Sequence, residues 1–272
     1  MSSPLQARIA TALLLAALVI VVLLHPGLSA TLAATLISIA IFAAGWEWAG
    51  FARLESVPAR LAYAAGIVIV LAGADWLARD PAWLEGMLRA TAVWWLVAFV
   101  WLALRAQAGG RLAAAVVGFL VLVPAGLGLE HLVELRPNGR LLLLYLLVLI
   151  AAADVGAYFG GRAFGRRKLA PHVSPGKTWE GFAAGMLAAA AVGAASAQMF
   201  DVPFWPWLFL CELVALVSVI GDLTESMFKR HVGLKDSGSL LPGHGGVLDR
   251  IDSLTAAAPT FLLGLMALGL QP

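Results

Sequence analysis

The chain has 272 residues, of which 61% are hydrophobic and only 12% are charged, and its formal net charge is +2. A soluble domain usually carries about 25% charged residues, so this composition excludes an ordinary soluble protein and indicates an integral membrane protein. The single cysteine, Cys211, excludes an intrachain disulfide bond.

Apolar runs recur along the chain, and each is roughly 20 residues long, which is the length that crosses the hydrocarbon core of a bilayer as a helix. We therefore predict an all-α integral membrane protein, a single polytopic bundle of about nine transmembrane helices. The predicted spans are 9–24, 30–51, 59–77, 87–105, 111–129, 140–160, 180–199, 204–222 and 251–270.

The distribution of basic residues predicts how the bundle is oriented. With nine spans and a cytoplasmic N-terminus, 14 of the 18 lysine and arginine residues fall in cytoplasmic segments, as the positive-inside rule requires. The C-terminus then lies on the opposite side. Both charge-rich loops, 161–179 and 223–250, face the cytoplasm, where nucleotides are.

The polar residues of this apolar chain are concentrated in residues 221–252. Four of them recur every three or four residues and so share one face of a helix: Asp222, Glu225, Ser226 and Lys229. Asp249 and Asp252 lie three residues apart at the start of the last span. Because the last two spans are sequential and antiparallel, we expect these acidic pairs to meet at one depth.

Converging carboxylates at a membrane surface suit a hard cation such as Mg²⁺, which prefers oxygen ligands and shares them with substrate phosphates. Four basic side chains surround them: Lys229, Arg230, Lys235 and Arg250. A metal ion together with basic side chains neutralises phosphate charge during transfer at phosphorus. The glycines around His244 allow close backbone approach to a ligand. For His244 itself a direct chemical role, a phosphate contact and a site-shaping role stay open.

A second polar cluster extends from Asp154 to Glu180. Asp154 lies inside the sixth span, where an ionisable side chain is expected to face the interior of the bundle. The following loop supplies lysines and hydroxyls for phosphate contact: Lys168, Ser174, Lys177 and Thr178. The seventh helix begins at Thr178 or Trp179, and the amides of a helix N-terminus favour anions.

Two further features lie within the apolar spans. Gly156 and Gly160, and likewise Gly181 and Gly185, have the four-residue spacing that lets membrane helices approach closely. Glu47, between two tryptophans, is interpreted as an interfacial residue and is left outside the site.

The polar motifs resemble those of the phosphatidate cytidylyltransferase family, also called CDP-diacylglycerol synthases. The family pattern is a serine, an apolar residue, Lys-Arg, Lys-Asp, His-Gly-Gly and Asp-Arg-x-Asp. This sequence matches it at Ser226, Phe228, Lys229, Arg230, Lys235, Asp236, His244, Gly245, Gly246, Asp249, Arg250 and Asp252. The resemblance covers about residues 150–255. Residues 1–140 match only in being a string of hydrophobic helices.

This resemblance implies that CTP and phosphatidic acid react to give CDP-diacylglycerol and pyrophosphate. The implied catalytic residues are Asp222, Lys229, Arg230, His244, Asp249 and Arg250. The expected metal is Mg²⁺, with a second, monovalent cation such as K⁺ left open. We assign Asp222 and Asp249 as the first-choice ligands of Mg²⁺, followed by Asp236 and Asp252. The substrate-binding candidates are Asp154, Lys168, Ser174, Lys177, Thr178, Ser226, Lys235, Gly245 and Gly246.

On this interpretation the partners are CTP, phosphatidic acid and the lipid bilayer, with no nucleic acid and with a homodimer left open. The expected location is the cytoplasmic (inner) membrane of a bacterium, with the active site facing the cytoplasm. The whole chain, 1–272, forms one transmembrane domain. In it, residues 141–272 carry the catalytic helices and loops, and residues 1–140 have no assigned role.

Three other functions are alternatives to this interpretation, and only the third belongs to a different class of protein. A CTP-dependent lipid kinase of the polyprenol type would transfer the γ-phosphate to an alcohol and would need a base for the hydroxyl. A CDP-alcohol phosphotransferase is disfavoured, because its Asp-Gly-x-x-Ala-Arg opening is missing. A secondary transporter would use Asp154 and Glu212 as ion sites, but the charge is concentrated in two cytoplasmic loops and no duplicated half is evident.

Overall fold

The structure is a computed structural model, and it describes residues 17, 20–21, 23–25, 30–105, 107, 109–135, 138–241 and 245–270. Its long helices are α2 (Ala30–Phe51), α3 (Val57–Leu77), α4 (Pro81–Arg105), α5 (Arg111–Glu134), α6 (Gly139–Phe164), α7 (Trp179–Ser196), α8 (Phe204–His231) and α9 (Leu248–Ala267). The first predicted span, 9–24, falls for the most part outside the described residues.

Each of the other predicted spans coincides with one helix, which confirms the all-helical bundle. Six of the described helices, α2 to α6 and α8, are long and apolar enough to cross a membrane. The main differences lie at helix ends, since α8 continues to His231, beyond the predicted end at 222. The extra turns carry the charged face of α8. Its ion pairs stabilise a helical segment that hydropathy alone does not predict.

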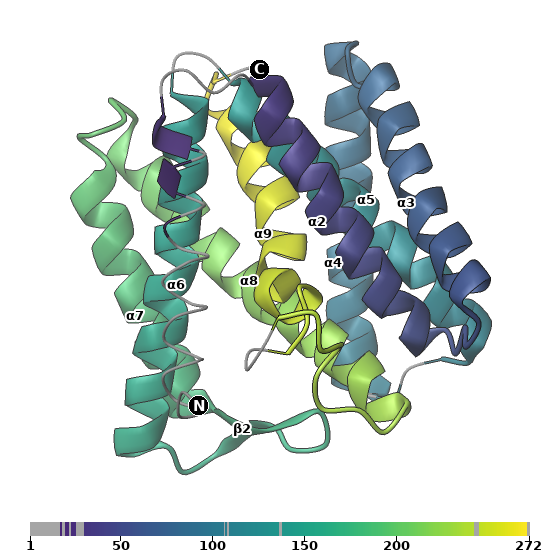
Figure 1. The fold of residues 1–272 in the computed structure, drawn as a ribbon. Coiled ribbons are helices and arrows are strands. Elements are labelled where there is room, and N and C mark those ends of the chain that lie inside the picture. The colour runs from purple at the N-terminus through teal and green to yellow at the C-terminus, as the bar shows by residue number, and fades with distance from the viewer. Residues whose placement is uncertain are drawn as a thin grey trace, which may run out of the picture.

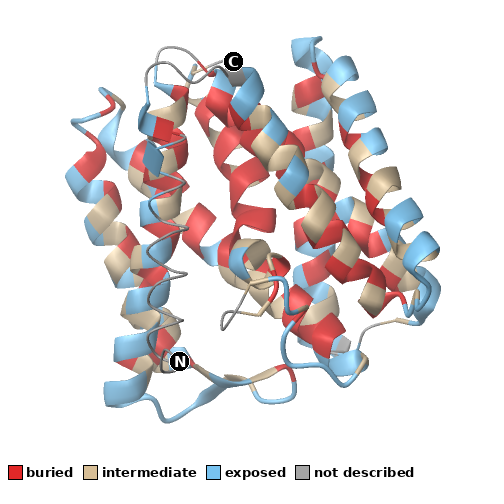
Figure 2. Cartoon of the chain, in the orientation of Figure 1, coloured by how far each residue is buried: buried red, intermediate tan, exposed pale blue. Residues whose placement is uncertain are grey.

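The helices form two groups with a central pair between them (Figure 1). Helices α6 and α7 pack along each other on one side, and α2, α3, α4 and α5 form the other side. Helices α8 and α9 lie between the groups and pack against each other. Figure 2 shows that α9 is buried along most of its length, whereas α3 is exposed along one face. That face is apolar, with Ile69 and Val70 among its exposed residues, as expected for contact with lipid.

A short antiparallel hairpin joins α6 to α7 where the sequence predicted only a loop. Its strands are β1 (Lys168–Ala170) and β2 (Ser174–Thr178). Thr178 ends β2 and caps α7, because its side-chain oxygen accepts a hydrogen bond from the Gly181 amide at 3.1 Å. This cap confirms the predicted start of the seventh helix. The hairpin thus holds Lys177 at the end of the bundle.

Small residues bring α6 and α7 close together, as the glycine spacing predicted. A Cβ atom added at Gly156 would lie 2.7 Å from the Ala188 Cβ, and one added at Gly185 would lie 2.8 Å from the Ala153 carbonyl oxygen. Both distances are shorter than van der Waals contact, so neither position accepts a side chain without a shift of the facing helix.

The substitution Gly156→Ala tests this packing. Overpacking a tight contact costs about 1–3 kcal/mol, so the variant should unfold at a lower temperature than the wild type in detergent micelles. Gly73→Ala in α3 is the matched control, because a Cβ there meets nothing within 4 Å. The control should be neutral or more stable, by about 0.5–1 kcal/mol. Equal melting temperatures for the two variants would contradict the close approach of α6 and α7.

Candidate active site

An ion pair joins the hairpin to α8. The ammonium nitrogen of Lys177 lies 2.6 Å from the Asp222 Oδ2 atom, and the Ser226 hydroxyl donates to the Asp222 Oδ1 atom at 3.2 Å. Asp222 and Ser226 lie four residues apart on the helical face predicted from the sequence. Lys177 therefore brings the second polar cluster of the sequence to the first.

A second lysine lies between two buried carboxylates. The ammonium nitrogen of Lys229 is 2.9 Å from Glu225 Oε1 and 2.8 Å from Asp249 Oδ1. The side chains of Lys229, Glu225 and Asp249 are only 9%, 2% and 8% exposed. A charge so far from water needs a partner, and this lysine compensates carboxylates from both α8 and α9. The pair with Asp249 confirms that the two helices meet at one depth.

Asp249 is also held by the backbone of the loop that precedes α9. The Ser237 amide donates to both of its carboxylate oxygens, at 3.1 and 2.9 Å, and the Gly246 amide donates to Oδ2 at 2.8 Å. Burial alone would raise the pKa of Asp249. The hydrogen bonds from Lys229 and from the two amides outweigh burial, and the pKa lies below its usual value. Asp249 therefore stays ionised and fixed in orientation.

Lys177 lies within the electrostatic reach of three aspartates that come from three helices. The Asp222 carboxylate repels the carboxylates of Asp154 and Asp252, and Lys177 attracts both. Lys229 attracts Asp252 as well, so Asp252 lies between the Lys177–Asp222 pair and the Lys229 pair to which Asp249 belongs. The predicted acidic residues form two adjacent clusters, each with its own lysine.

A cavity of about 570 Å³ opens beside the first cluster, between α6, α7, the hairpin and α8. Its polar lining residues are Asp154, Tyr158, Arg162, Ser174, Lys177 and Thr178. Its apolar lining includes Ala153, Ala157, Met186 and Val219. Four of the predicted substrate-binding residues, Asp154, Ser174, Lys177 and Thr178, therefore line one cavity.

Tyr158 and Arg162 line the cavity but were not among the predicted residues. The Arg162 guanidinium donates to the Tyr158 hydroxyl at 3.2 Å. Both follow Asp154 at intervals of four residues on α6, so they share its helical face. That spacing was a signal available in the sequence.

Other predicted residues lie at the edge of the site. Lys168, Lys235 and Asp236 are exposed, and none of them lines the cavity. The Arg230 guanidinium donates to the carbonyl oxygens of Val173, at 3.3 Å, and Leu234, at 3.2 Å, so it joins α8 to the hairpin.

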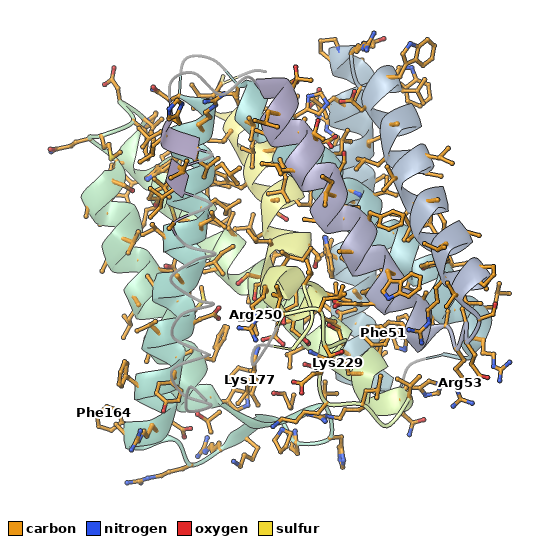
Figure 3. All side chains as sticks on the ribbon, in the orientation of Figure 1. Phe51, Arg53, Phe164, Lys177, Lys229 and Arg250 are labelled. Atoms are coloured by element: carbon orange, nitrogen blue, oxygen red, sulfur yellow. The ribbon has the colours of Figure 1, made fainter. Side chains whose placement is uncertain are left out.

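The last predicted residues lie around the glycine-rich loop. Arg250 is exposed in the first turn of α9, and Figure 3 shows it in the same region of the bundle as Lys177 and Lys229. Gly245 and Gly246 lie against Asp249. His244 lies outside the described residues.

The carboxylate oxygens of the site are the type of ligand that a hard cation prefers. Asp222 and Asp252 offer oxygen donors from facing helices, and Mg²⁺ takes most of its remaining ligands from water and substrate phosphates. Across the described residues, no three or more His, Cys, Asp or Glu side chains form a preformed metal cage. A metal bound here would thus depend on one or two carboxylates and on the substrate.

Glu47 is a residue that the sequence reasoning left out of the site. The prediction that it is interfacial is wrong, because it is only 3% exposed. Its carboxylate accepts hydrogen bonds from the Ser237 hydroxyl and from the amides of Val247 and Leu248. A lone carboxylate in an otherwise apolar helix was the available signal, since such a group needs partners.

Comparison with known proteins gives one consistent result. The sequence pattern of the Cytidylyltransferase family matches residues 6–268. A phosphatidate cytidylyltransferase of Pseudomonas aeruginosa is 43% identical over 231 residues, which cover 82% of this chain and 84% of the relative. One of Haemophilus influenzae is 41% identical over 244 residues, 79% of this chain and 83% of the relative. One of Bacillus subtilis is 41% identical over 160 residues, 56% of this chain and 59% of the relative.

Lys229→Met tests the buried charge cluster through stability. Methionine keeps most of the volume but leaves Glu225 and Asp249 without their cation, and breaking such a buried pair costs about 3–5 kcal/mol. Thermal unfolding in detergent micelles should therefore occur at a clearly lower temperature. Lys235→Met, at an exposed position, is the control and should unfold as the wild type does. Unchanged stability of the Lys229 variant would show that the cluster does not need this cation.

Proposed function

The chain belongs to the cytidylyltransferase family, and we propose that it is the enzyme that joins CTP and phosphatidic acid to give CDP-diacylglycerol and pyrophosphate. The observation that carries the proposal is the cavity beside Lys177. Its walls are apolar along α6 and α7, and its polar end carries Lys177 and Arg162. Such a cavity suits a molecule with an apolar body and an anionic head.

The reaction needs little proton chemistry. A phosphate oxygen of the lipid attacks the α-phosphorus of CTP, the bond from that phosphorus to the bridging β-oxygen breaks, and pyrophosphate leaves. Because the lipid phosphate is already an oxyanion, no general base is required. Two anionic groups must instead be brought together in line, so the site has to position them and screen their repulsion.

The described residues supply both requirements. Lys177 and Arg162 face the cavity, where they can hold the lipid phosphate. Lys229 is fixed between Glu225 and Asp249, so it holds the Asp249 carboxylate in place without a rearrangement during the reaction. Ser226, hydrogen-bonded to Asp222, keeps that carboxylate turned toward Lys177. The acyl chains of the lipid can stay in the bilayer throughout.

The oxygen atoms of Asp222 and Asp252 are the proposed ligands of Mg²⁺, with Asp249 and Asp236 as further candidates. When bound, Mg²⁺ neutralises phosphate charge as a Lewis acid. Asp249 already accepts four hydrogen bonds, from Lys229, Ser237 and Gly246, and this fixed orientation favours Asp252 over Asp249 beside Asp222. A second, monovalent cation such as K⁺ stays a proposal.

The placement in the membrane is also a proposal. Nine spans with a cytoplasmic N-terminus would put the hairpin and the loop before α9 in the cytoplasm, where CTP is. The side on which basic residues gather supports this orientation. Two of the relatives come from Pseudomonas and Haemophilus, which supports a bacterial inner membrane. A homodimer stays a proposal as well.

A labelling experiment tests the reaction. With phosphatidic acid in mixed micelles and CTP labelled at the α-phosphorus, the purified protein should transfer label into the lipid phase with Mg²⁺ but not with a chelator. Asp249→Asn should abolish transfer, because an amide NH₂ group would face the donor groups of Lys229, Ser237 and Gly246.

Labelling at the γ-phosphorus is the control for the alternatives. A lipid kinase would carry that label into the lipid and release CDP, whereas cytidylyl transfer releases the label in pyrophosphate. If active membranes gave no labelled product with either nucleotide, an enzymatic function would be rejected and the transporter would remain as the alternative.

The proposed metal ligands have a test of their own. Asp222→Asn and Asp252→Asn should each raise the Mg²⁺ concentration needed for half-maximal activity by about tenfold or more. They should also weaken the binding of Mn²⁺, measured by electron paramagnetic resonance without CTP. Asp201→Asn is the control, since Asp201 is exposed and lies between α7 and α8. Wild-type Mn²⁺ binding in both site variants would exclude these two carboxylates as ligands.

A further inference from the structure

The buried carboxylate of Glu47 lies directly behind the loop that holds Asp249. Glu47 belongs to α2, in the half of the chain to which the sequence assigned no role. Its Oε2 atom accepts from the Ser237 hydroxyl at 3.1 Å and from the Leu248 amide at 2.8 Å, and its Oε1 atom accepts from the Val247 amide at 3.1 Å. All three partners come from residues 237–248.

Each partner of Glu47 adjoins a contact of Asp249. Ser237 gives its hydroxyl to Glu47 and its backbone amide to Asp249. Gly246, whose amide donates to Asp249, directly precedes Val247, whose amide donates to Glu47. The two carboxylates therefore hold one short segment between them, Glu47 from α2 and Asp249 from α9.

The glycines of this segment fit tightly against Glu47. A Cβ atom added at Gly238 or Gly246 would overlap the Glu47 carboxylate, and at Gly246 it would overlap the Ser237 hydroxyl as well. These two positions thus require glycine because of Glu47, a reason that is separate from any approach of substrate to the loop.

The position of Glu47 also suits its charge. The amides of Val247 and Leu248 are the first amides of α9, and a helix N-terminus favours a negative group. The hydrogen bonds of a carboxylate are charge-assisted and about twice as strong as neutral ones. Glu47 therefore fixes both the start of α9 and the loop before it.

We propose that Glu47 is a positioning residue, which acts through Ser237 and Gly246 to hold Asp249 in its working orientation. Through Glu47 the N-terminal helices contribute to the reaction without touching substrate. The inference rests on the proposed cytidylyl transfer for its effect on rate. Its effect on the loop can be measured without any activity.

The variant Glu47→Gln tests the inference with little change of shape, because the amide keeps one acceptor but turns an NH₂ group toward N–H and O–H donors. Glu130→Gln is the matched control. Glu130 is also a buried glutamate, 7% exposed, and it accepts from the Ser38 hydroxyl at 2.7 Å, away from the loop. Ser237→Ala removes the hydroxyl from the same network and keeps the amide.

We expect kcat for lipid labelling to fall about 10- to 100-fold in Glu47→Gln, the usual effect of losing a partner that orients a site residue. Glu130→Gln should keep wild-type kcat. The losses in Glu47→Gln and Ser237→Ala should be less than multiplicative in the double variant, because both remove one shared hydrogen bond. Hydrogen exchange in peptides that cover residues 237–249 should be faster in Glu47→Gln and unchanged in Glu130→Gln.

Two results would overturn the positioning role. One is wild-type kcat and wild-type exchange in Glu47→Gln. The other is equal losses of activity and melting temperature in both glutamate variants, which would make Glu47 only one of several buried groups needed for folding. If the wild-type protein transfers no label to lipid, the proposed function fails. In that case the exchange measurement alone decides whether Glu47 holds the loop.

Discussion

The rest of the structure depends on a buried lysine held between two buried carboxylates. In a bundle with so few charged residues, buried carboxylates need a cation beside them, and Lys229 lies between Glu225 and Asp249. This requirement fixes the distance between α8 and α9. It also explains why α8 continues past its apolar part, because the helix must reach the depth at which Asp249 begins α9.

Elements from distant parts of the chain close around this cluster of charges. The hairpin between α6 and α7 brings Lys177 to Asp222 from one side, and α2 brings Glu47 to the loop before α9 from the other. The first contact pairs two charged side chains, and the second joins a carboxylate to backbone amides that would otherwise be unsatisfied. The charged groups of the site are therefore held in place, and the cavity on α6 and α7 opens beside them.

The cavity gives a chemical reason for placing the site among membrane helices. Much of its wall is apolar, and Asp154 and Lys177 line it as well. An enzyme that joins a nucleotide to a lipid has to accept one substrate from water and the other from the bilayer. The family membership and the shape of the cavity agree on this point.

The sequence by itself determined what depends on neighbours along the chain. Apolar runs predicted the helices, and spacings of three and four residues placed Asp222 with Ser226 and Glu225 with Lys229 on one face of α8, because helical geometry is local. The motif between Ser226 and Asp252 was sufficient to recognise the family. The spacing of Asp154, Tyr158 and Arg162 carried further information of the same kind.

Only the tertiary structure decided which charged groups meet. Lys177 pairs with Asp222 across 45 positions, and Glu47 meets Ser237 across 190 positions. No periodic pattern encodes such contacts, since they follow from how α2, the hairpin and α8 pack around α9. The same packing put Lys177 beside Asp222 and Lys229 beside Asp249. A helical face gives the direction of a side chain, but the partner that satisfies its charge is chosen by the fold.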